Sequence, residues 1–159
     1  MIRLVWASEA DLPFIMATER GDGYDAFVGR WDEDQHRPAL ADNRYAYFVG
    51  YLKEKPVGFV ILRDWASEDR VTLLKRIAVT CPNQEYGKAL LKAVVDFVFN
   101  ETPAHRFWLG VFPENARARR VYETVGFVAE GVSRGSVLFR GIFRDELIMA
   151  ILRTDIHYD

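Results

Sequence analysis

The feature that most constrains this chain is a change of hydrophobic periodicity after Val79. Residues 74–79 (Leu-Lys-Arg-Ile-Ala-Val) form a short, mainly apolar run that is typical of a buried strand. After a short loop, apolar side chains recur at helical spacing from about Asn83 to Phe99. A polar stripe repeats every fourth residue along the same helix: Lys88, Lys92, Asp96 and Asn100. The chain therefore contains a strand, a loop and a helix in succession, which indicates an α/β fold.

The start of this helix has the features of an anion-binding site. Pro82 and Asn83 suit a helix N-terminus, because proline is accommodated in the first turn and asparagine can cap it. The pattern Gln84-x-x-Gly87-x-Ala89 places a glycine in the first turn, where a ligand can approach the backbone closely. Unpaired N–H groups and the helix dipole favour an anion there, and Lys88 adds a positive charge. The pattern predicts a phosphate site; the alternative is that Gly87 only relieves crowding between helix and sheet.

A second strand and helix follow. Residues 106–111 have the pattern of another buried strand, and Pro113-Glu114-Asn115 opens a helix that ends at Gly126. Asn115 and Tyr122 are seven residues apart, which is almost two helical turns, so they lie on the same side of this helix. An aromatic residue at helical spacing is also typical of a core position. Tyr122 is therefore either part of a site or part of the core.

Taken together, the motifs resemble those of the GNAT superfamily of acyl-CoA-dependent N-acetyltransferases. The matching residues are Arg76-Ile77-Ala78-Val79, Gln84-x-x-Gly87-x-Ala89 and Asn115-x-x-Ala118-x-x-x-Tyr122-Glu123-x-x-Gly126-Phe127-x-x-Glu130-Gly131. The closing motif Gly141-x-Phe143-Arg144-Asp145-Glu146-Leu147 is similar to the branch that includes ribosomal-protein alanine and spermidine N-acetyltransferases. The resemblance is close over the C-terminal two-thirds of the chain and covers the N-terminal third only by its order of elements.

The order of elements predicts a mixed sheet with helices on both sides, a three-layer α/β/α arrangement. We expect strands at 2–6, 45–52, 57–63, 72–79, 106–111, 128–138 and 143–152, and helices at 8–19, 32–40, 83–99 and from 115. The resemblance implies the GNAT acyl-CoA N-acyltransferase fold, in which strands 72–79 and 106–111 splay apart at one end. The thioester arm of the cofactor would enter that gap and pair with the backbone of Ile77, Ala78 and Val79.

The resemblance also implies a set of site residues and a mechanism. The cofactor would be acetyl-CoA, as a co-substrate, held by Ile77, Ala78, Val79, Gln84, Glu85, Tyr86, Gly87, Lys88, Ala89, Asn115 and Tyr122. The acceptor amine would attack the thioester directly, with a backbone N–H near Ile77 stabilising the oxyanion. Tyr122 would protonate the departing thiolate, since a phenol with a pKa of about 10 is protonated at neutral pH. Asn115 would hold the pantetheine arm or an ordered water.

A general base is harder to identify from the sequence. The resembled family often places an acid on the fourth or fifth strand, but here Leu73, Leu74 and Gly110 occupy the corresponding places. Glu130 and Asp64 are candidates, although exposed carboxylates are common on protein surfaces. Proton loss to a chain of waters is an equal alternative.

The N-terminal region suggests the kind of acceptor. It combines acidic residues with aromatic ones: Glu19, Asp22, Asp25, Asp32, Glu33 and Asp34 with Tyr24, Phe27 and Trp31. An acidic, aromatic cleft suits a cationic amine such as a polyamine, an aminoglycoside or a basic peptide N-terminus. The alternative is that these charges form a solvated face. We expect His36 to lie on the surface.

Length and composition set further bounds. A chain of 159 residues fits one compact domain, residues 1–159, which the resemblance implies is an N-acetyltransferase domain. The 23 acidic and 21 basic residues give a net charge of −2, which argues against nucleic-acid binding. No apolar run approaches the ~20 residues that span a bilayer, so we expect a cytoplasmic protein without membrane contact.

The single cysteine, Cys81, excludes an intrachain disulfide, and the histidines have no metal-ligand spacing. The resemblance allows a homodimer, because strand-rich members of the family often dimerise, and leaves the oligomeric state open.

Other functions are compatible with the same scaffold. The alternatives are a non-catalytic acyl-CoA-binding sensor and an interaction domain without cofactor affinity. The presence of both Asn115 and Tyr122 favours the enzyme over either of them. A hydride-transfer enzyme is disfavoured because the phosphate motif is not G-x-G-x-x-G.

Overall fold

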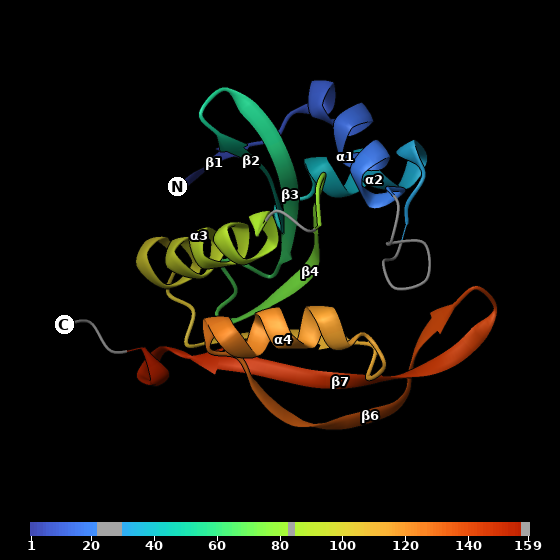
Figure 1. The fold of residues 1–159 in the computed structure, drawn as a ribbon, viewed down its shortest axis with the longest axis vertical. Helices are drawn as coiled ribbons and strands as arrows, with labels where there is room; N and C mark the ends of the chain where they lie inside the picture. Colours follow the sequence, from blue (N-terminus) through green and yellow to red (C-terminus); the bar gives the residue numbers. More distant parts are fainter. Residues whose placement is uncertain (22–29, 83–84, 157–159) are drawn as a thin grey trace.

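The structure is a computed structural model that describes residues 1–21, 30–82 and 85–156 (Figure 1). Its strands are β1 (Ile2–Trp6), β2 (Tyr45–Leu52), β3 (Lys55–Arg63), β4 (Val71–Val79), β5 (Arg106–Val111), β6 (Val128–Phe139) and β7 (Ile142–Leu152). Its α-helices are α1 (Leu12–Glu19), α2 (Glu33–Ala41), α3 (Tyr86–Glu101) and α4 (Ala116–Val125). Short 3-10 helices lie at Glu9–Asp11 and Arg153–Asp155.

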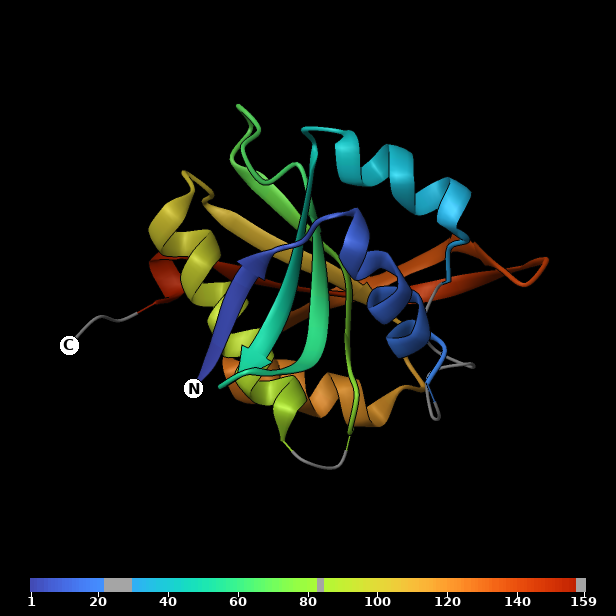
Figure 2. The ribbon, with the colours of Figure 1, turned by 90° about the horizontal axis from the view of Figure 1, so that it is seen from above.

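The strands form one mixed sheet in the order β1-β2-β3-β4-β5-β7-β6. All neighbouring pairs are antiparallel except β4 and β5, which are parallel. Helices α1 and α2 lie on one face, while α3 and α4 pack on the other, as the view from above shows for the first three (Figure 2). The predicted α/β fold with helices on both faces is confirmed.

The central strands are buried on both faces, which explains their nearly unbroken apolar sequences. Phe48 and Val60 point into the larger core cluster, under α3. Their chain neighbours Tyr47 and Phe59 point to the opposite face and pack against Leu12 of α1. Alternate side chains of a strand face opposite sides, so β2 and β3 join the two cores.

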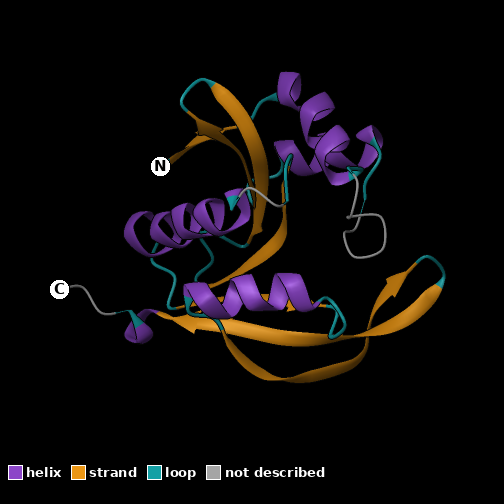
Figure 3. Ribbon diagram, in the orientation of Figure 1, coloured by secondary structure: helices purple, strands orange, loops and turns teal. Residues whose placement is uncertain are grey.

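The pairing between β4 and β5 is short. Within the described residues it covers only Val71–Leu73 against Arg106–Trp108. Beyond that point β4 stays paired with β3 up to Val79, and β5 stays paired with β7 up to Val111. The sheet is therefore divided at this point, and the two halves diverge. Figure 3 shows β6 and β7 continuing as a long hairpin past the N-terminal end of α4.

Helix α3 begins later than the sequence suggested. It starts at Tyr86, with Glu85 as the N-cap in a left-handed conformation at φ 60°, rather than near Asn83. Asn83 and Gln84 lie outside the described residues. Gly87 is still in the first turn, as expected. In the described part of the chain, no helix is long and apolar enough to cross a membrane.

Candidate active site

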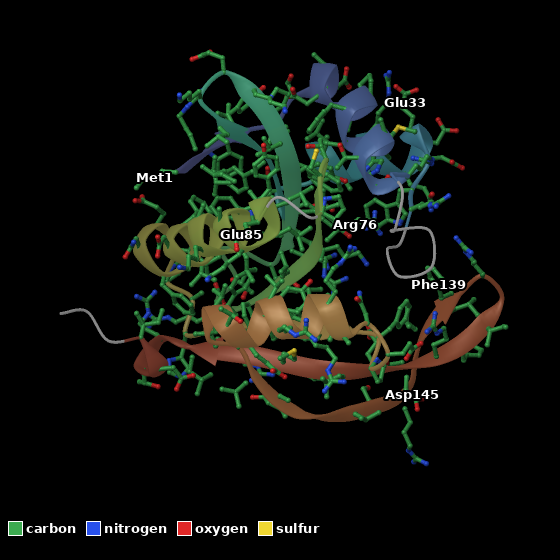
Figure 4. All side chains as sticks on the ribbon, in the orientation of Figure 1. Met1, Glu33, Arg76, Glu85, Phe139 and Asp145 are labelled. Atoms are coloured by element: carbon green, nitrogen blue, oxygen red, sulfur yellow. The ribbon has the colours of Figure 1, made fainter. Side chains whose placement is uncertain are left out.

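A cavity of about 280 Å³ lies where β4 and β5 diverge. One wall is β4 from Leu74 to Val79, and a second is the end of β5 with the start of α4. The β6–β7 hairpin closes one side through Val137, Phe139 and Glu146. Arg76 of β4 and Phe139 of the hairpin both line the cavity and are labelled in Figure 4. The division of the sheet thus leaves a space for a ligand.

Gly87 lines the cavity from the first turn of α3. A Cβ atom added at this position would meet no other heavy atom within 4 Å. Crowding between the helix and the sheet therefore does not explain the glycine. The open space lies at a helix N-terminus, where unpaired N–H groups favour a phosphate, and a missing side chain lets the phosphate come close.

The predicted cofactor-binding residues divide into two groups. Six of them line the cavity: Ile77, Ala78, Val79, Gly87, Asn115 and Tyr122. The side chains of Glu85, Tyr86, Lys88 and Ala89 are not among the lining residues. Tyr86 and Ala89, three positions apart on α3, pack instead against the larger core cluster. Gln84 lies outside the described residues.

Helix α4 presents Asn115 and Tyr122 to the same cavity. Asn115 is the N-cap of the helix, and its Oδ1 accepts a hydrogen bond from the N–H of Ala118 at 3.3 Å. The ring of Tyr122 also contacts Phe127, with 5.8 Å between ring centroids. Both residues therefore have a structural role as well as access to the cavity.

Four charged side chains are among the described residues that line the cavity: Lys75, Arg76, Arg117 and Glu146. Burial lowers the pKa of Lys75, and the neighbouring charges of Arg76 and Arg63 lower it further. The negative charge of Glu146 opposes this shift. The Glu146 carboxylate thus acts electrostatically on Lys75, and both side chains line the cavity.

A buried polar network of Glu19, His36 and Tyr47 lies beside the cavity. The carboxylate of Glu19 is fully buried and accepts a hydrogen bond from Nη1 of Arg76 at 3.1 Å. His36 is also fully buried, with Nε2 at 2.8 Å from Glu19 and Nδ1 at 2.8 Å from the hydroxyl of Tyr47. The prediction that His36 lies on the surface is wrong, because α2 turns this residue toward the sheet. Burial also raises the pKa of Tyr47.

The remaining acidic residues of the N-terminal region do not form a cleft in the described structure. Asp32 caps α2, and Glu33 pairs with Arg37 at 2.9 Å on the exposed side of that helix. Asp34 is exposed. Trp31 stacks under the guanidinium of Arg76, 5.0 Å from its ring centroid. Asp22, Tyr24, Asp25 and Phe27 lie outside the described residues.

The two candidate bases from the sequence are not among the residues that line the cavity. Glu130 forms a two-bonded ion pair with Arg106, at 2.7 and 2.8 Å, and this contact lowers the pKa of the Glu130 carboxyl. Asp64 pairs with Arg44 at 3.3 Å. The carboxylate that does line the cavity, Glu146, was not singled out as a base. In the sequence, Glu146 belongs to the closing motif from Gly141 to Leu147, in which nothing distinguishes it from Asp145 as a site residue.

Comparisons with known proteins identify the family of the chain. The sequence profile described as "Acetyltransferase (GNAT) family" matches residues 12–127. A probable N-acetyltransferase of Bacillus subtilis, YjcK, is 40% identical over 73 residues, which cover 43% of this chain and 40% of that protein. The chain thus matches less than half the length of this relative.

Solved structures show the same fold. A chimera of the Vibrio cholerae spermidine N-acetyltransferase SpeG and hSSAT has a TM-score of 0.78 and 25% identity, and the match covers 96% of each chain. The spermidine N-acetyltransferase from Vibrio cholerae in complex with CoA and spermine has a TM-score of 0.81 and 23% identity, with 97% of this chain and 96% of that chain covered. From the profile match and the shared fold, we conclude that the chain belongs to the acetyltransferase (GNAT) family.

Proposed function

We propose that this protein is an N-acetyltransferase that transfers the acetyl group of acetyl-CoA directly to a primary amine. The observation that carries the proposal is the cavity between β4 and β5, which brings together Gly87 at the start of α3 and Asn115 and Tyr122 of α4. The family supplies the donor, acetyl-CoA. Its pyrophosphate suits the N-terminus of α3, and its extended arm suits the edge of β4 that β5 leaves unpaired after Leu73.

The backbone and side-chain groups that line the cavity have separate roles in this proposal. The backbone of Ile77, Ala78 and Val79 pairs with the pantetheine arm, and one N–H there stabilises the charge that develops on the carbonyl oxygen. Tyr122 donates a proton to the departing sulfur. The side-chain N–H₂ of Asn115 is not used by its capping bond, which involves Oδ1, so it is available to the arm or to a water.

We propose primary amines as the class of acceptor. A relative of the same fold was solved with spermine, so polyamines belong among the candidates. Aminoglycosides, amino acids and peptide N-termini each offer the required primary amine as well. The acceptor enters on the side of the sheet opposite to α3 and α4, because the donor arm approaches from the side of those helices.

The test is coenzyme A release from acetyl-CoA against a panel of these four acceptor classes, with Tyr122→Phe measured in parallel. We expect turnover with one class and a loss of about 10²–10⁴-fold in kcat for the variant, the usual contribution of a general acid. Unchanged turnover of Tyr122→Phe across the pH range would exclude the acid role. Saturable binding of acetyl-CoA without turnover by any acceptor would support the sensor instead.

A homodimer is part of the proposal. Exposed apolar side chains on the β6–β7 hairpin support self-association: Val132, Leu138, Ile142 and Phe143. Light scattering at several concentrations measures the mass of the particle, and replacement of Phe143 by Ser should shift it toward the monomer. A monomer at all concentrations would contradict this part of the proposal.

A further inference from the structure

The carboxylate of Glu146 occupies the space that a side chain at Gly110 would fill. A Cβ atom built on Gly110 would lie 2.7 Å from the carboxylate carbon of Glu146, well inside van der Waals contact. Gly110 pairs with Ile148 across the β5–β7 ladder, which makes Glu146 its diagonal neighbour on the same face of the sheet. The side chain that β5 lacks at this position is thus replaced by a carboxylate that reaches across from β7.

This carboxylate lies on the opposite face of the sheet from Tyr122. The residues on either side of Gly110, Leu109 and Val111, point into the larger core cluster, and Tyr122 packs against that cluster. Alternate residues of a strand face opposite sides, so Gly110 and Glu146 face the side of α1 and α2. Both Tyr122 and Glu146 nevertheless line the cavity, because β4 and β5 are separated there. A ligand in the gap can therefore contact a phenol on one side and a carboxylate on the other.

Glu146 is the only carboxylate among the described residues that line the cavity. Its Oε1 accepts a hydrogen bond from the hydroxyl of Ser136 on β6 at 3.0 Å, which orients the group and leaves Oε2 for a ligand. The other charged groups of the cavity and of the strand around Glu146 are Lys75, Arg76, Arg117, Arg144 and Asp145. Arg76 is paired with Glu19, Arg144 with Glu114, and Asp145 accepts a bond from the backbone of Gly135. Lys75 is the cation whose pKa responds to Glu146.

We infer that Glu146 binds the ammonium group of the acceptor and removes its proton before attack. This inference rests on the proposed acetyl transfer. Of the two protons that the nitrogen loses, the first passes to Glu146 and then to solvent, which frees the lone pair to attack the carbonyl carbon. As the C–S bond breaks, Tyr122 protonates the thiolate, and the second proton from nitrogen restores the phenol. Glu146 is thus the base that the fourth and fifth strands do not provide.

The first test uses Glu146→Gln, because glutamine keeps an oxygen for Ser136 and removes the charge. With an acceptor that the wild type acetylates, kcat/KM at pH 7 should fall by about 10²–10⁴-fold. The deficit should shrink as pH rises toward 10, because an alkylamine with a pKa near that of lysine, about 10.4, loses its proton without help there. Coenzyme A affinity should be unchanged, which shows that the variant is folded.

A control variant separates this role from a structural one. Glu130→Gln removes a carboxylate outside the cavity, so kcat/KM should stay within a few-fold of the wild type. Ser136→Ala removes the hydrogen bond that orients the Glu146 carboxylate but keeps its charge, so we expect a smaller loss of kcat/KM than in Glu146→Gln. A loss in Glu146→Gln that is the same at every pH, or no loss at all, would overturn the role of Glu146 while the transferase stands. A wild type that acetylates nothing would overturn both.

The second test moves the carboxylate instead of removing it. In Gly110→Ala, the added methyl group must displace the flexible end of Glu146, so the fold is retained while the carboxylate leaves its position. We expect a loss of kcat/KM that approaches that of Glu146→Gln. In the double variant the two effects should not add, because they act on the same group. Fully additive effects would show that Gly110 matters for another reason.

Discussion

Glu19, at the end of α1, and Arg76, in the middle of β4, form a buried ion pair with 3.1 Å between Oε2 and Nη1. The carboxylate is fully buried, and the guanidinium is 8% exposed. Because Arg76 also lines the cavity, this pair fixes α1 against the wall of the site. His36 completes the contact by bridging Glu19 to Tyr47 of β2. Four elements, α1, α2, β2 and β4, are thus joined through this carboxylate and its histidine partner.

Removal of the Glu19 carboxylate should destabilise the folded protein. Glu19→Ala leaves Arg76 buried without its partner, and we expect the free energy of unfolding to fall by about 3–5 kcal/mol. Chemical denaturation measures the change. Glu33→Ala is the matched control, because it breaks an exposed pair with Arg37 and should change stability far less than Glu19→Ala. Equal effects of the two substitutions would show that burial of Glu19 contributes nothing.

Gly87→Ala should raise the stability of the protein and weaken its binding of acetyl-CoA. The methyl group enters open space, and alanine favours a helix over glycine by about 0.5–1 kcal/mol, so the free protein should become more stable. In the proposed function, the same methyl group occupies the place where a phosphate of acetyl-CoA approaches α3, so KM for acetyl-CoA should rise by on the order of tenfold, which corresponds to about 1.4 kcal/mol. Thermal unfolding and steady-state kinetics give the two values. An unchanged KM would argue against phosphate binding at this turn.

Asn115 has two roles that different substitutions can distinguish. Asn115→Ala removes the cap of α4 and should cost about 1 kcal/mol of stability. Asn115→Asp retains a capping oxygen, so stability should stay within a few tenths of a kcal/mol, but it loses the N–H₂ donors in the cavity. We expect KM for acetyl-CoA to rise in both variants. If the aspartate variant binds acetyl-CoA as well as the wild type, Asn115 acts only as a cap.

The ion pair between Glu130 and Arg106 predicts a small dependence of stability on pH. The contact lowers the folded-state pKa of Glu130 below its unfolded value of about 4.3. The stabilisation is therefore complete above that value and is lost as pH falls through the folded-state pKa. Because Glu130 is 40% exposed, solvent screening should keep the effect below about 1 kcal/mol. The free energy of unfolding of Glu130→Gln should equal that of the wild type in acid and should be slightly lower than that of the wild type at neutral pH.

Much of the fold follows from local sequence patterns. The bounds of β1, β2 and β5 match the predicted ranges, because apolar runs between turn residues define strands clearly. The start of α3 was placed too early, since Pro82 and Asn83 are good helix-start residues by themselves. The chain instead begins the helix after a left-handed residue at Glu85, which sequence preference disfavours.

The site was only partly predictable. Asn115, Tyr122 and Gly87 belong to motifs with fixed spacing along two helices, so their convergence follows from the fold. His36 has charged neighbours in the sequence, and its buried partners Glu19 and Tyr47 are 17 and 11 residues away, so no local pattern shows its burial. The position of the Glu146 carboxylate in the cavity depends on the pairing of β7 with β5 and on the absence of a side chain at Gly110. Neither relationship exists until the sheet is assembled.

The three-residue pairing of β4 with β5 also has a consequence for the cooperativity of the molecule. Past Leu73 and Trp108, few backbone hydrogen bonds join the two halves of the sheet, and side-chain packing under α3 and α4 must hold them together. Amide hydrogens along the facing edges should exchange with solvent more readily than those elsewhere in these strands. A donor arm that pairs in the gap acts as a temporary eighth strand, and its binding should raise the unfolding temperature by mass action. Each turnover would then close the sheet when the donor binds and open it again when coenzyme A departs.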